Sequence, residues 1–516
     1  MFFFLYSSVP LFLSSYFIYF NKSVVLSGLF LWGHYTNSAS YQEKIRVSLN
    51  SSSIIPLNKV MHEKSIESIE SEYFDGLTIL DQVEKFNHQL IEYDSSLKIL
   101  SNDRRKSTDG SSGKLFFLGE DRLDSTWAYL KKELKEIDTA FGPKTLKIWV
   151  SEESFNMSCI TQEMVDILAR SFLTEGDNND IYDWVTNVFG EEWGSVDEKK
   201  FIEKQDEINI LLTDIEHDNK IAGAISGYFY AKDTYRKAYY SGSNESLIFY
   251  IDAPIFASHS ADVEWSIHQP QPKKILSVLA HEFEHMIFFY QKKIKLHVEK
   301  TVPWVDELLA ISIEDLLATK LNSLGIRGVP SFVGDAGEYK IYDNRLARFN
   351  KNIEESVLQW DGELKDYSKV ASFGAYLIRN YHGATVLHNI MHNAYGDEAA
   401  IVMAVNHSLV DEEYKDFDAI LQDWGIAILL SSEELDQPKY QFNRGDFFDF
   451  PYGDTLYSVG SINFFNYYIQ PTIRTIMDQS IEPHANLYYK VADVVQGELN
   501  IKLNVPDSVQ VALISK

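Results

Sequence analysis

The sequence predicts an α+β protein, in which a part built on a small β-sheet is followed by a helical part and then by a β-rich region. Three observations predict this order. Short apolar runs bounded by polar or turn residues, which are typical of buried strands, occur before residue 274. Apolar residues recur at helical spacing from residue 274 to about 430. Beyond residue 431, apolar and polar residues alternate with a period of two, which is typical of strands.

Residues 114–273 form the predicted N-terminal part of the folded body, and residues 274–430 the helical part. We expect three strands in the first part, at Leu146–Val150, Ile208–Leu212 and Leu247–Ile251. Helical patterns are predicted in the same part at Ser125–Ile137 and Gln162–Leu173. The second part is predicted to hold helices at Ile275–Lys293, Pro303–Leu321, Asp366–Tyr381 and Gly383–Ala394. In residues 431–516 the alternating runs Leu456–Ile469 and Ala485–Ile514 predict a C-terminal β-rich domain.

The composition excludes several classes of protein. The 516 residues include 47 Lys and Arg but 75 Asp and Glu, so the formal net charge is −28. The phosphate backbone would repel such a chain, and we expect no nucleic-acid partner. A single cysteine, Cys159, can form neither an intrachain disulfide nor a Cys-based zinc site. Any bound metal must therefore be held by histidines and carboxylates.

Residues 1–40 predict export, with two interpretations left open. Phe2–Phe20 is apolar and uncharged, and has about the minimum length of a membrane anchor. Alternatively, Lys22, the apolar run Val24–Trp32 and the small residues Ser38–Ser40 form a cleavable signal. A buried N-terminal helix is the third alternative. Export predicts a secreted or envelope-associated protein, with possible membrane attachment through the apolar segment.

Residues 41–113 form a polar region with one helical stretch around Leu80–Tyr93. The run Ser101–Gly113 is rich in Ser, Gly and charged residues, which predicts a flexible, cleavable linker. We therefore expect the folded body to begin near Lys114. The region from 41 to 113 is then a candidate pro-segment.

The chemistry of the chain is concentrated in His281-Glu282-Phe283-Glu284-His285. On a helix, His281 and His285 lie on one face about one turn apart, so both can bind one metal ion. Glu282 is placed to reach a water molecule rather than the metal. Apolar flanks predict a buried helix, in which such polar residues are costly without a partner. Two imidazoles and one further protein ligand leave an open position on zinc, which is typical of catalytic sites.

The third ligand is predicted on the following helix. A metzincin would continue with Gly and His where this chain has Phe288 and Gln291, so that type is excluded. Glu307 lies on a largely apolar surface of the helix that begins at Pro303, as the gluzincin pattern requires. The competing residues within reach are Asp306, Glu314, Asp315 and His297.

Helical geometry favours Glu307 over these competitors. Asp306 should face about 100° away from it, so we expect Asp306→Ala to keep both metal and activity. Glu314 shares the face of Glu307 but lies roughly 10 Å further along the helix axis, where it can orient a ligand. Substitution of Glu314 by alanine should then weaken metal affinity by roughly 10–100-fold. A second histidine pair, His388 and His392, lacks the adjacent glutamate, and amphipathic-helix histidines are the favoured interpretation.

These motifs, together with several flanking segments, resemble the hyicolysin family of zinc metallopeptidases, within the HExxH gluzincins. The resemblance covers roughly residues 114–430. It rests on His281–His285, Trp304–Leu308, Glu314–Asp315, Leu146–Val150, Ile208–Ile215, Gly227–Tyr230, Ser372–Leu377 and Asn380–Gly383. The chain departs from the family at Leu308, where glycine is usual, and has Ile311 where thermolysin-type gluzincins carry aspartate.

The resemblance implies a zincin-like catalytic domain and a secreted or surface Zn²⁺ endopeptidase acting on proteins or peptides. It assigns zinc binding to His281, His285 and Glu307, and the general-base role to Glu282. Related aminopeptidase-type gluzincins place a tyrosine where this chain has Tyr367, which makes it a candidate catalytic oxyanion stabiliser. The alternative is a catalytically degenerate metal-binding surface protein that binds a partner.

Overall fold

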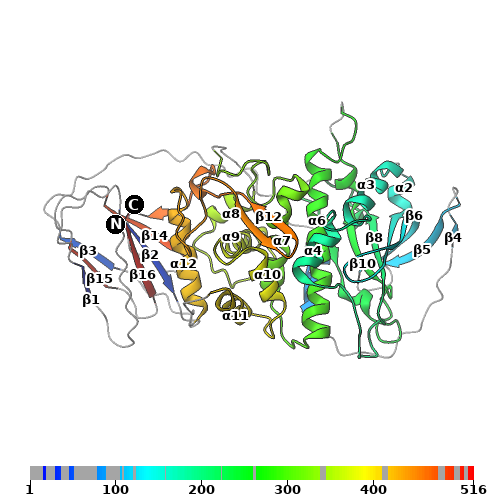
Figure 1. The fold of residues 1–516 in the computed structure, drawn as a ribbon, viewed down its shortest axis with the longest axis horizontal. Helices are drawn as coiled ribbons and strands as arrows, with labels where there is room; N and C mark the ends of the chain where they lie inside the picture. Colours follow the sequence, from blue (N-terminus) through cyan, green and yellow to red (C-terminus); the bar gives the residue numbers. More distant parts are fainter. Residues whose placement is uncertain are drawn as a thin grey trace.

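The computed structural model shows a mixed α+β protein whose parts lie in a row along its longest axis (Figure 1). Among the helices it describes, none is both long and apolar enough to cross a membrane. The described residues are 15–18, 29–35, 46–50, 78–88, 105–106, 110–119, 124–156, 159–221, 223–259, 263–337, 344–409, 416–474, 483–492, 500–504 and 509–515.

A seven-stranded sheet forms one end of the molecule (Figure 1). Strands β7, β8 and β10 are parallel neighbours at its centre, and the remaining pairs are antiparallel. All three predicted strands are present, as β7, β8 and β10. In spatial order the strands are β4 (Arg105–Lys106), β5 (Ser112–Phe117), β6 (Ser125–Ile137), β7 (Lys144–Ser151), β8 (Glu207–Thr213), β10 (Leu247–Asp252) and β9 (Gly227–Phe229).

The prediction of a helix at Ser125–Ile137 is wrong, because this segment is strand β6. Its charged residues have high helix propensity, but its first half contains Thr126, Trp127 and Tyr129, which favour strands. β6 pairs with β5 on one side and β7 on the other. Pairing on both sides satisfies its backbone groups, and this tertiary contribution outweighs local propensity.

The predicted flexible linker is also partly structured. Arg105 and Lys106 pair with Gly113 and Ser112 in the short β4–β5 hairpin at the outer edge of the sheet. Residues 101–104 and 107–109 of the predicted linker lie outside the described residues. The folded body therefore includes residues before the predicted start at Lys114.

Aromatic side chains join the sheet to helix α6 (Pro270–Phe288). Phe283, in the middle of the histidine motif, contacts Phe172 and Tyr182, with ring centroids 5.1 and 5.4 Å apart. It also lies 6.4 Å from Phe249 of β10. Phe172 and Tyr182 belong to helices α3 (Gln162–Phe172) and α4 (Ile181–Phe189). Phe283 thereby fixes which face of α6 is turned to the sheet.

The helical part lies in the middle of the molecule, where α7 is buried between α6 and α9 (Figure 1). The predicted helix at Pro303–Leu321 has the observed bounds, and the predicted Ile275–Lys293 continues from α6 into the π-helix η3. Beyond α6 these helices are η3 (Phe289–Lys295), α7 (Pro303–Leu321), α8 (Arg345–Lys351), α9 (Leu364–Asn380), α10 (Ala384–Met391), α11 (Glu398–Ser408) and α12 (Phe417–Leu430). The described part of the chain also contains the α-helices α1 (Thr78–His88), α2 (Glu152–Asn156) and α5 (Ala253–Ala257). Short 3-10 helices are η1 (Ile215–His217), η2 (Ala231–Thr234) and η4 (Phe464–Asn466).

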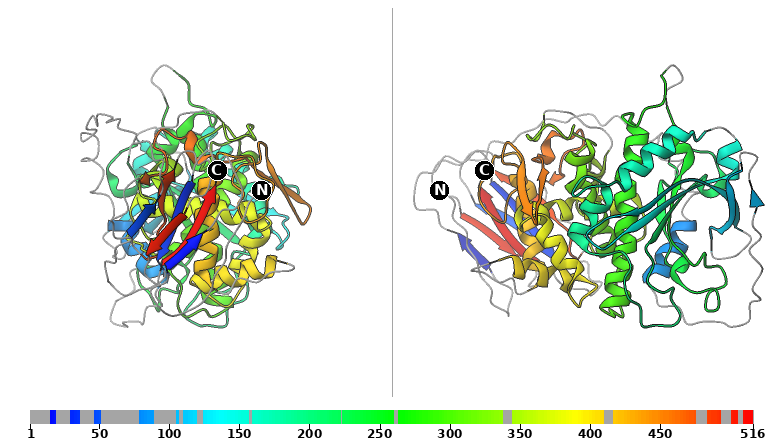
Figure 2. Two further views of the ribbon diagram at one scale, coloured as in Figure 1. Left: turned by 90° about the vertical axis from the view of Figure 1, so that its left-hand side faces the viewer. Right: turned by 45° about the vertical axis from the view of Figure 1, so that its right-hand side comes forward.

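Strands from both ends of the chain form the sheets at the other end of the molecule. In the sheet β13-β14-β2-β16, strand β2 lies between β14 and β16 and is antiparallel to both. Figure 2 shows these N-terminal and C-terminal strands side by side. The sequence did not predict this pairing, because the apolar run Val24–Trp32, which overlaps β2, was interpreted as part of an export signal in one of the alternatives. The strands of these sheets are β1 (Ser15–Ile18), β2 (Leu29–Tyr35), β3 (Arg46–Asn50), β13 (Ile473–Arg474), β14 (Leu487–Ala492), β15 (Asn500–Asn504) and β16 (Val509–Ser515). A separate hairpin of β11 (Phe448–Tyr452) and β12 (Thr455–Val459) packs against the helical part.

Candidate metal centre

Helix α6 turns its two motif histidines toward helix α7. His281 and His285 are one helical turn apart, and their ring centroids are 4.8 Å apart. Because Phe283 occupies the opposite side of the helix and packs against the sheet, the two imidazoles point away from it. Both imidazoles are almost completely buried. The local spacing and the burial of Phe283 together orient this pair.

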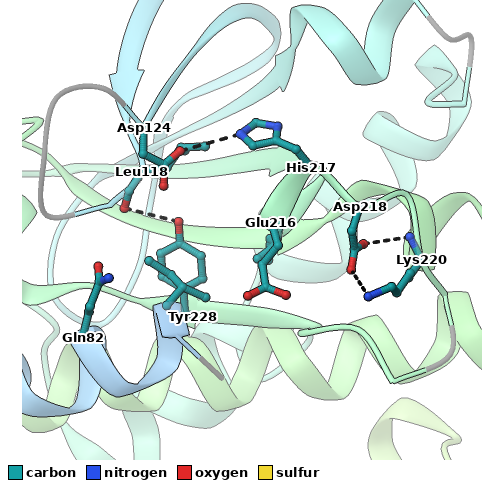
Figure 3. Close-up of a pocket in the computed structure, with 10 residues that line it drawn as sticks. Gln82, Leu118, Asp124, Glu216, His217, Asp218, Lys220 and Tyr228 are labelled. Atoms are coloured by element: carbon teal, nitrogen blue, oxygen red, sulfur yellow. Dashed lines mark hydrogen bonds and ion pairs between the residues drawn. The ribbon is translucent and has the colours of Figure 1, made fainter. Parts of the chain in front are cut away.

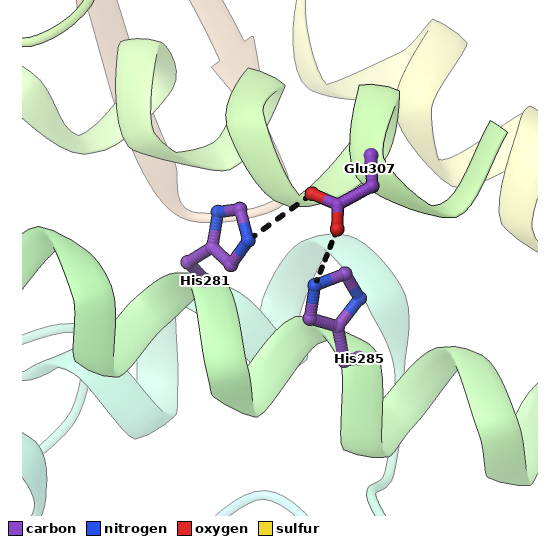
Figure 4. Close-up of side chains that lie close together, drawn as sticks. All are labelled: His281, His285 and Glu307. Atoms are coloured by element: carbon purple, nitrogen blue, oxygen red, sulfur yellow. Dashed lines mark ion pairs between the residues drawn. The ribbon is translucent and has the colours of Figure 1, made fainter. Parts of the chain in front are cut away.

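Glu307 completes a group of three ligand atoms (Figure 4). Its Oε2 lies 3.3 Å from His281 Nε2, and its Oε1 lies 3.8 Å from His285 Nε2. All three ligand atoms are within 4.8 Å of one another. Oε2 is buried and accepts no hydrogen bond within the described part of the chain. Two imidazole nitrogens and one unsatisfied carboxylate oxygen fit a metal cation, and this donor set is typical of catalytic zinc.

Carboxylates behind the imidazoles determine which nitrogen of each histidine faces Glu307. His281 Nδ1 donates to Glu314 Oε1 at 2.8 Å, and His285 Nδ1 donates to Asp306 Oδ1 at 2.8 Å. With a proton on Nδ1, the lone pair of each Nε2 is available for a metal. Glu314 therefore has the position predicted for a carboxylate that orients a ligand, here His281.

The structure gives a reason to revise the expectation that Asp306 is dispensable, because its carboxylate accepts a hydrogen bond from Nδ1 of His285, a candidate ligand. The helical rotation of about 100° turns it away from the Glu307 oxygens but toward the far side of the His285 ring. We now expect Asp306→Ala, like Glu314→Ala, to weaken metal affinity by roughly 10–100-fold. Competitive titration with a chromophoric chelator would measure this. Lys320→Ala, at the far end of α7, serves as the control, and unchanged affinity in Asp306→Ala would contradict the orienting role.

The centre carries an excess of negative charge. Burial disfavours the charged form of His281, but the adjacent carboxylates of Glu307 and Glu314 outweigh this effect and raise its pKa to about 9. Burial has the same effect on His285, but Asp306 and Glu307 raise the pKa of this group well above its usual value. Positive charge is thus stabilised between the two helices. A divalent cation supplies the same compensation.

Glu282 lies beside the edge strand of the sheet. Burial raises the pKa of its carboxyl to about 7, against the opposing effect of the two motif histidines. Gly227 of β9 lies directly against it, because a Cβ there would meet Tyr250 O at 2.9 Å and Glu282 Cγ at 3.2 Å. Only glycine permits this close approach of the strand to α6. The carboxyl of Glu282 is therefore confined between the strand and the histidines.

Tyr367 also lies at the centre. Tyr367 lies on helix α9, and its hydroxyl donates a hydrogen bond to Glu307 Oε1 at 3.2 Å. Burial, followed by the charge of Glu307, raises the pKa of this phenol well above its usual value, so the group is a proton donor. The structure thus brings together all five residues that the sequence analysis selected: His281, Glu282, His285, Glu307 and Tyr367.

Two residues of the centre had no signal in the sequence. Arg345 of α8 donates from Nη1 to Glu314 Oε1 at 2.9 Å. It lowers the pKa of Glu314 to about 2, against the effect of burial. His88 of α1 places Nε2 3.3 Å from Asp306 Oδ2. Each is an isolated residue outside the motif helices, so only the tertiary fold reveals it.

The second histidine pair does not form a comparable centre. His388 Nδ1 hydrogen-bonds to the carbonyl of Val188 at 2.8 Å, and burial lowers the pKa values of both His388 and His392. Among the described residues, no set of three ligand atoms includes either histidine. The contact of His388 with Val188 agrees with a role in packing.

A further set of three ligand atoms comes from Glu284, His285 and Asp306. It includes the hydrogen bond between His285 and Asp306, so it belongs to the same centre.

A separate cavity of about 400 Å³ lies on the sheet side of the molecule (Figure 3). Tyr228 of β9 lines it, next to Gly227, and its hydroxyl donates to Leu118 O at 3.5 Å. Three acidic residues, Asp124, Glu216 and Asp218, also line it. None of the metal-centre residues does.

Comparison with known proteins identifies the family of this chain. Residues 128–433 match the model of the peptidase M30 family. The neutral metalloprotease ShpI of Staphylococcus hyicus is 24% identical over 375 residues, covering 69% of this chain and 74% of the relative. These matches confirm the resemblance to the hyicolysin family, and a metallopeptidase implies a metal cofactor. Because the family match spans more than half of the chain, this protein belongs to the peptidase M30 family of metallopeptidases.

Proposed function

We propose that the protein is a zinc endopeptidase with a zincin-like catalytic domain. The observation that carries this proposal is the convergence of two Nε2 atoms and one unsatisfied carboxylate oxygen beside Glu282. His281, His285 and Glu307 would hold the ion. Zinc is favoured over Mg²⁺ or Ca²⁺, because those ions prefer sites made of oxygen ligands.

The residues of the centre have separate roles in the proposed hydrolysis. When bound, zinc polarises the scissile carbonyl and increases the acidity of water. Glu282 accepts a proton from the attacking water and passes it to the leaving amine. Burial raises the pKa of its carboxyl, which favours uptake of a proton from water. Asp306 and Glu314 hold the two imidazoles in place.

Hydrolysis of casein tests this function directly. We expect the purified chain to cleave it internally, to lose this activity with a chelator, and to recover it when Zn²⁺ is added back. A degenerate surface protein would bind zinc but leave casein intact. Metal binding without cleavage of casein or gelatin would therefore favour that alternative.

We expect Tyr367→Phe to lower kcat by about 10²–10³-fold with little change in KM, because it removes one donor to the developing oxyanion. In the structure its hydroxyl donates to Glu307, which places it beside a proposed metal ligand. Steady-state kinetics on a fluorogenic peptide measure the effect, with the exposed Tyr468→Phe as the control. An unchanged kcat would remove Tyr367 from the catalytic set.

We also propose that the protein is exported, either secreted or held at the cell envelope. Cleavage at Ser38–Ser40 would remove β2 from its sheet, whereas an anchor over Phe2–Phe20 would require β1 to leave its own. N-terminal sequencing of the exported protein would decide between them.

A further inference from the structure

Helix α1 (Thr78–His88) packs into the body of the protein. Its apolar face is buried through Ile79, Val83 and Phe86, which are 9%, 7% and 2% exposed. The ring of Phe86 meets those of Tyr230, Tyr235 and Tyr240 edge-on, at centroid distances of 5.4, 5.6 and 5.2 Å. The helix was expected to belong to a polar, removable region, yet it contributes to the core.

Polar contacts join α1 to both halves around the metal centre. On the sheet side, Asn87 Nδ2 donates to Phe229 O at 2.9 Å, and Ala231 N donates to Asn87 Oδ1 at 2.8 Å. On the helical side, Trp360 Nε1 donates to Glu84 Oε2 at 2.8 Å. α1 therefore bridges the edge strand and the helices that surround the histidines.

The last turn of α1 is held by a buried lysine. Lys293, which is 3% exposed, donates from Nζ to the carbonyls of His88 at 3.0 Å and Glu299 at 3.2 Å. A cation at this position suits the negative end of the helix dipole. Without α1 the buried ammonium group would lose one of these two contacts, which is unfavourable.

The ring of His88 has two defined partners. Nε2 lies 3.3 Å from Asp306 Oδ2, and Nδ1 lies 2.9 Å from Thr301 Oγ1. A carboxylate can only accept a hydrogen bond, so Nε2 carries the proton and Nδ1 accepts from the Thr301 hydroxyl. Burial lowers the pKa of this imidazole to about 4, which keeps it in this neutral form. Each oxygen of Asp306 thus faces one histidine.

We infer that His88 is a positioning residue of the metal centre, which holds Asp306 and through it His285, and that α1 is a permanent part of the active enzyme. The chain of contacts runs from His88 Nε2 to Asp306 Oδ2, and from Asp306 Oδ1 to His285 Nδ1. This inference rests on the proposed function. It also limits any removable pro-segment to residues before α1.

Substitution of His88, read by a Co²⁺ spectrum, tests the inference. In His88→Ala we expect zinc affinity to fall by roughly 10–100-fold and the visible bands of the Co²⁺-loaded protein to shift. The kcat value should fall while KM stays nearly constant. His88→Gln, whose amide nitrogen can reach the position of Nε2, should restore most of the affinity and the spectrum.

Val83→Ala is the matched control on the same helix. It removes packing against the core without touching Asp306, so it should lower thermal stability while leaving affinity and spectrum unchanged. If Val83→Ala reproduces the effects of His88→Ala, the role of His88 is only to dock the helix, and the inference fails. Because His88→Gln keeps a side chain of similar length, it remains informative if His88→Ala does not fold.

Three other outcomes would overturn the inference. Unchanged affinity and spectrum in His88→Ala would do so, and so would an increase in peptidase activity, which would make α1 an inhibitor. An active enzyme whose N-terminus lies beyond residue 88 would also contradict it. Failure of the proposed function is distinguishable, because it would appear in the wild type as absent metal binding or absent hydrolysis.

Discussion

Replacement of Glu282 by glutamine is expected to reduce peptide hydrolysis by about 10²–10⁴-fold, the usual effect of losing a general acid–base group. The amide has nearly the same shape but cannot accept a proton from water. Glu282 contributes none of the three atoms that converge on the metal position, so the metal content of the variant should stay near that of the wild type. Hydrolysis of a fluorogenic peptide and metal analysis of the same sample measure both effects.

The matched control is Glu299→Gln, on the exposed loop between η3 and α7. It makes the same chemical change outside the centre, and it should leave activity unchanged. Ordinary activity in Glu282→Gln would remove Glu282 from proton transfer. Loss of metal together with activity would instead show that the residue contributes to binding the ion.

Replacement of Glu307 by alanine is expected to abolish both metal binding and activity. Among the residues that the structure describes, Glu307 alone completes a set of three ligand atoms with both histidines, and the substitution removes its carboxylate. Two imidazoles alone leave zinc with too few protein ligands to be retained at a catalytic site. Zinc content after dialysis, measured by elemental analysis, and casein cleavage check the two expectations together.

This substitution also separates Glu307 from its neighbour in the sequence. In Asp306→Ala we expect a lower affinity for zinc, but full occupancy at saturating zinc. The reason is that Asp306 orients His285 and does not contribute to the group of Glu307 and the two histidines. Full zinc occupancy in Glu307→Ala at sub-micromolar free zinc would contradict the assignment of the third ligand. Circular dichroism of both variants would establish that the fold is intact.

The local parts of this centre were predictable from the sequence. The spacing of His281 and His285 fixes their shared face on any helix, and Pro303 marks the start of the helix that carries Glu307. Both elements are apolar over long stretches, so their helical pattern is strong. Prediction failed at β6, where charged residues suggested a helix but two neighbouring strands supply the backbone hydrogen bonds.

The tertiary structure alone decided how the centre is supported. Asp306, Arg345 and His88 act through contacts between side chains that lie 21 to 218 positions apart, and no spacing rule connects such residues. The place of β2 between two C-terminal strands has the same origin. Sequence periodicity reports which face of an element is buried, whereas the partner of that face depends on how the whole chain packs. The sequence by itself thus determined the ligand-bearing helices, and only the fold determined the residues that hold those ligands in place.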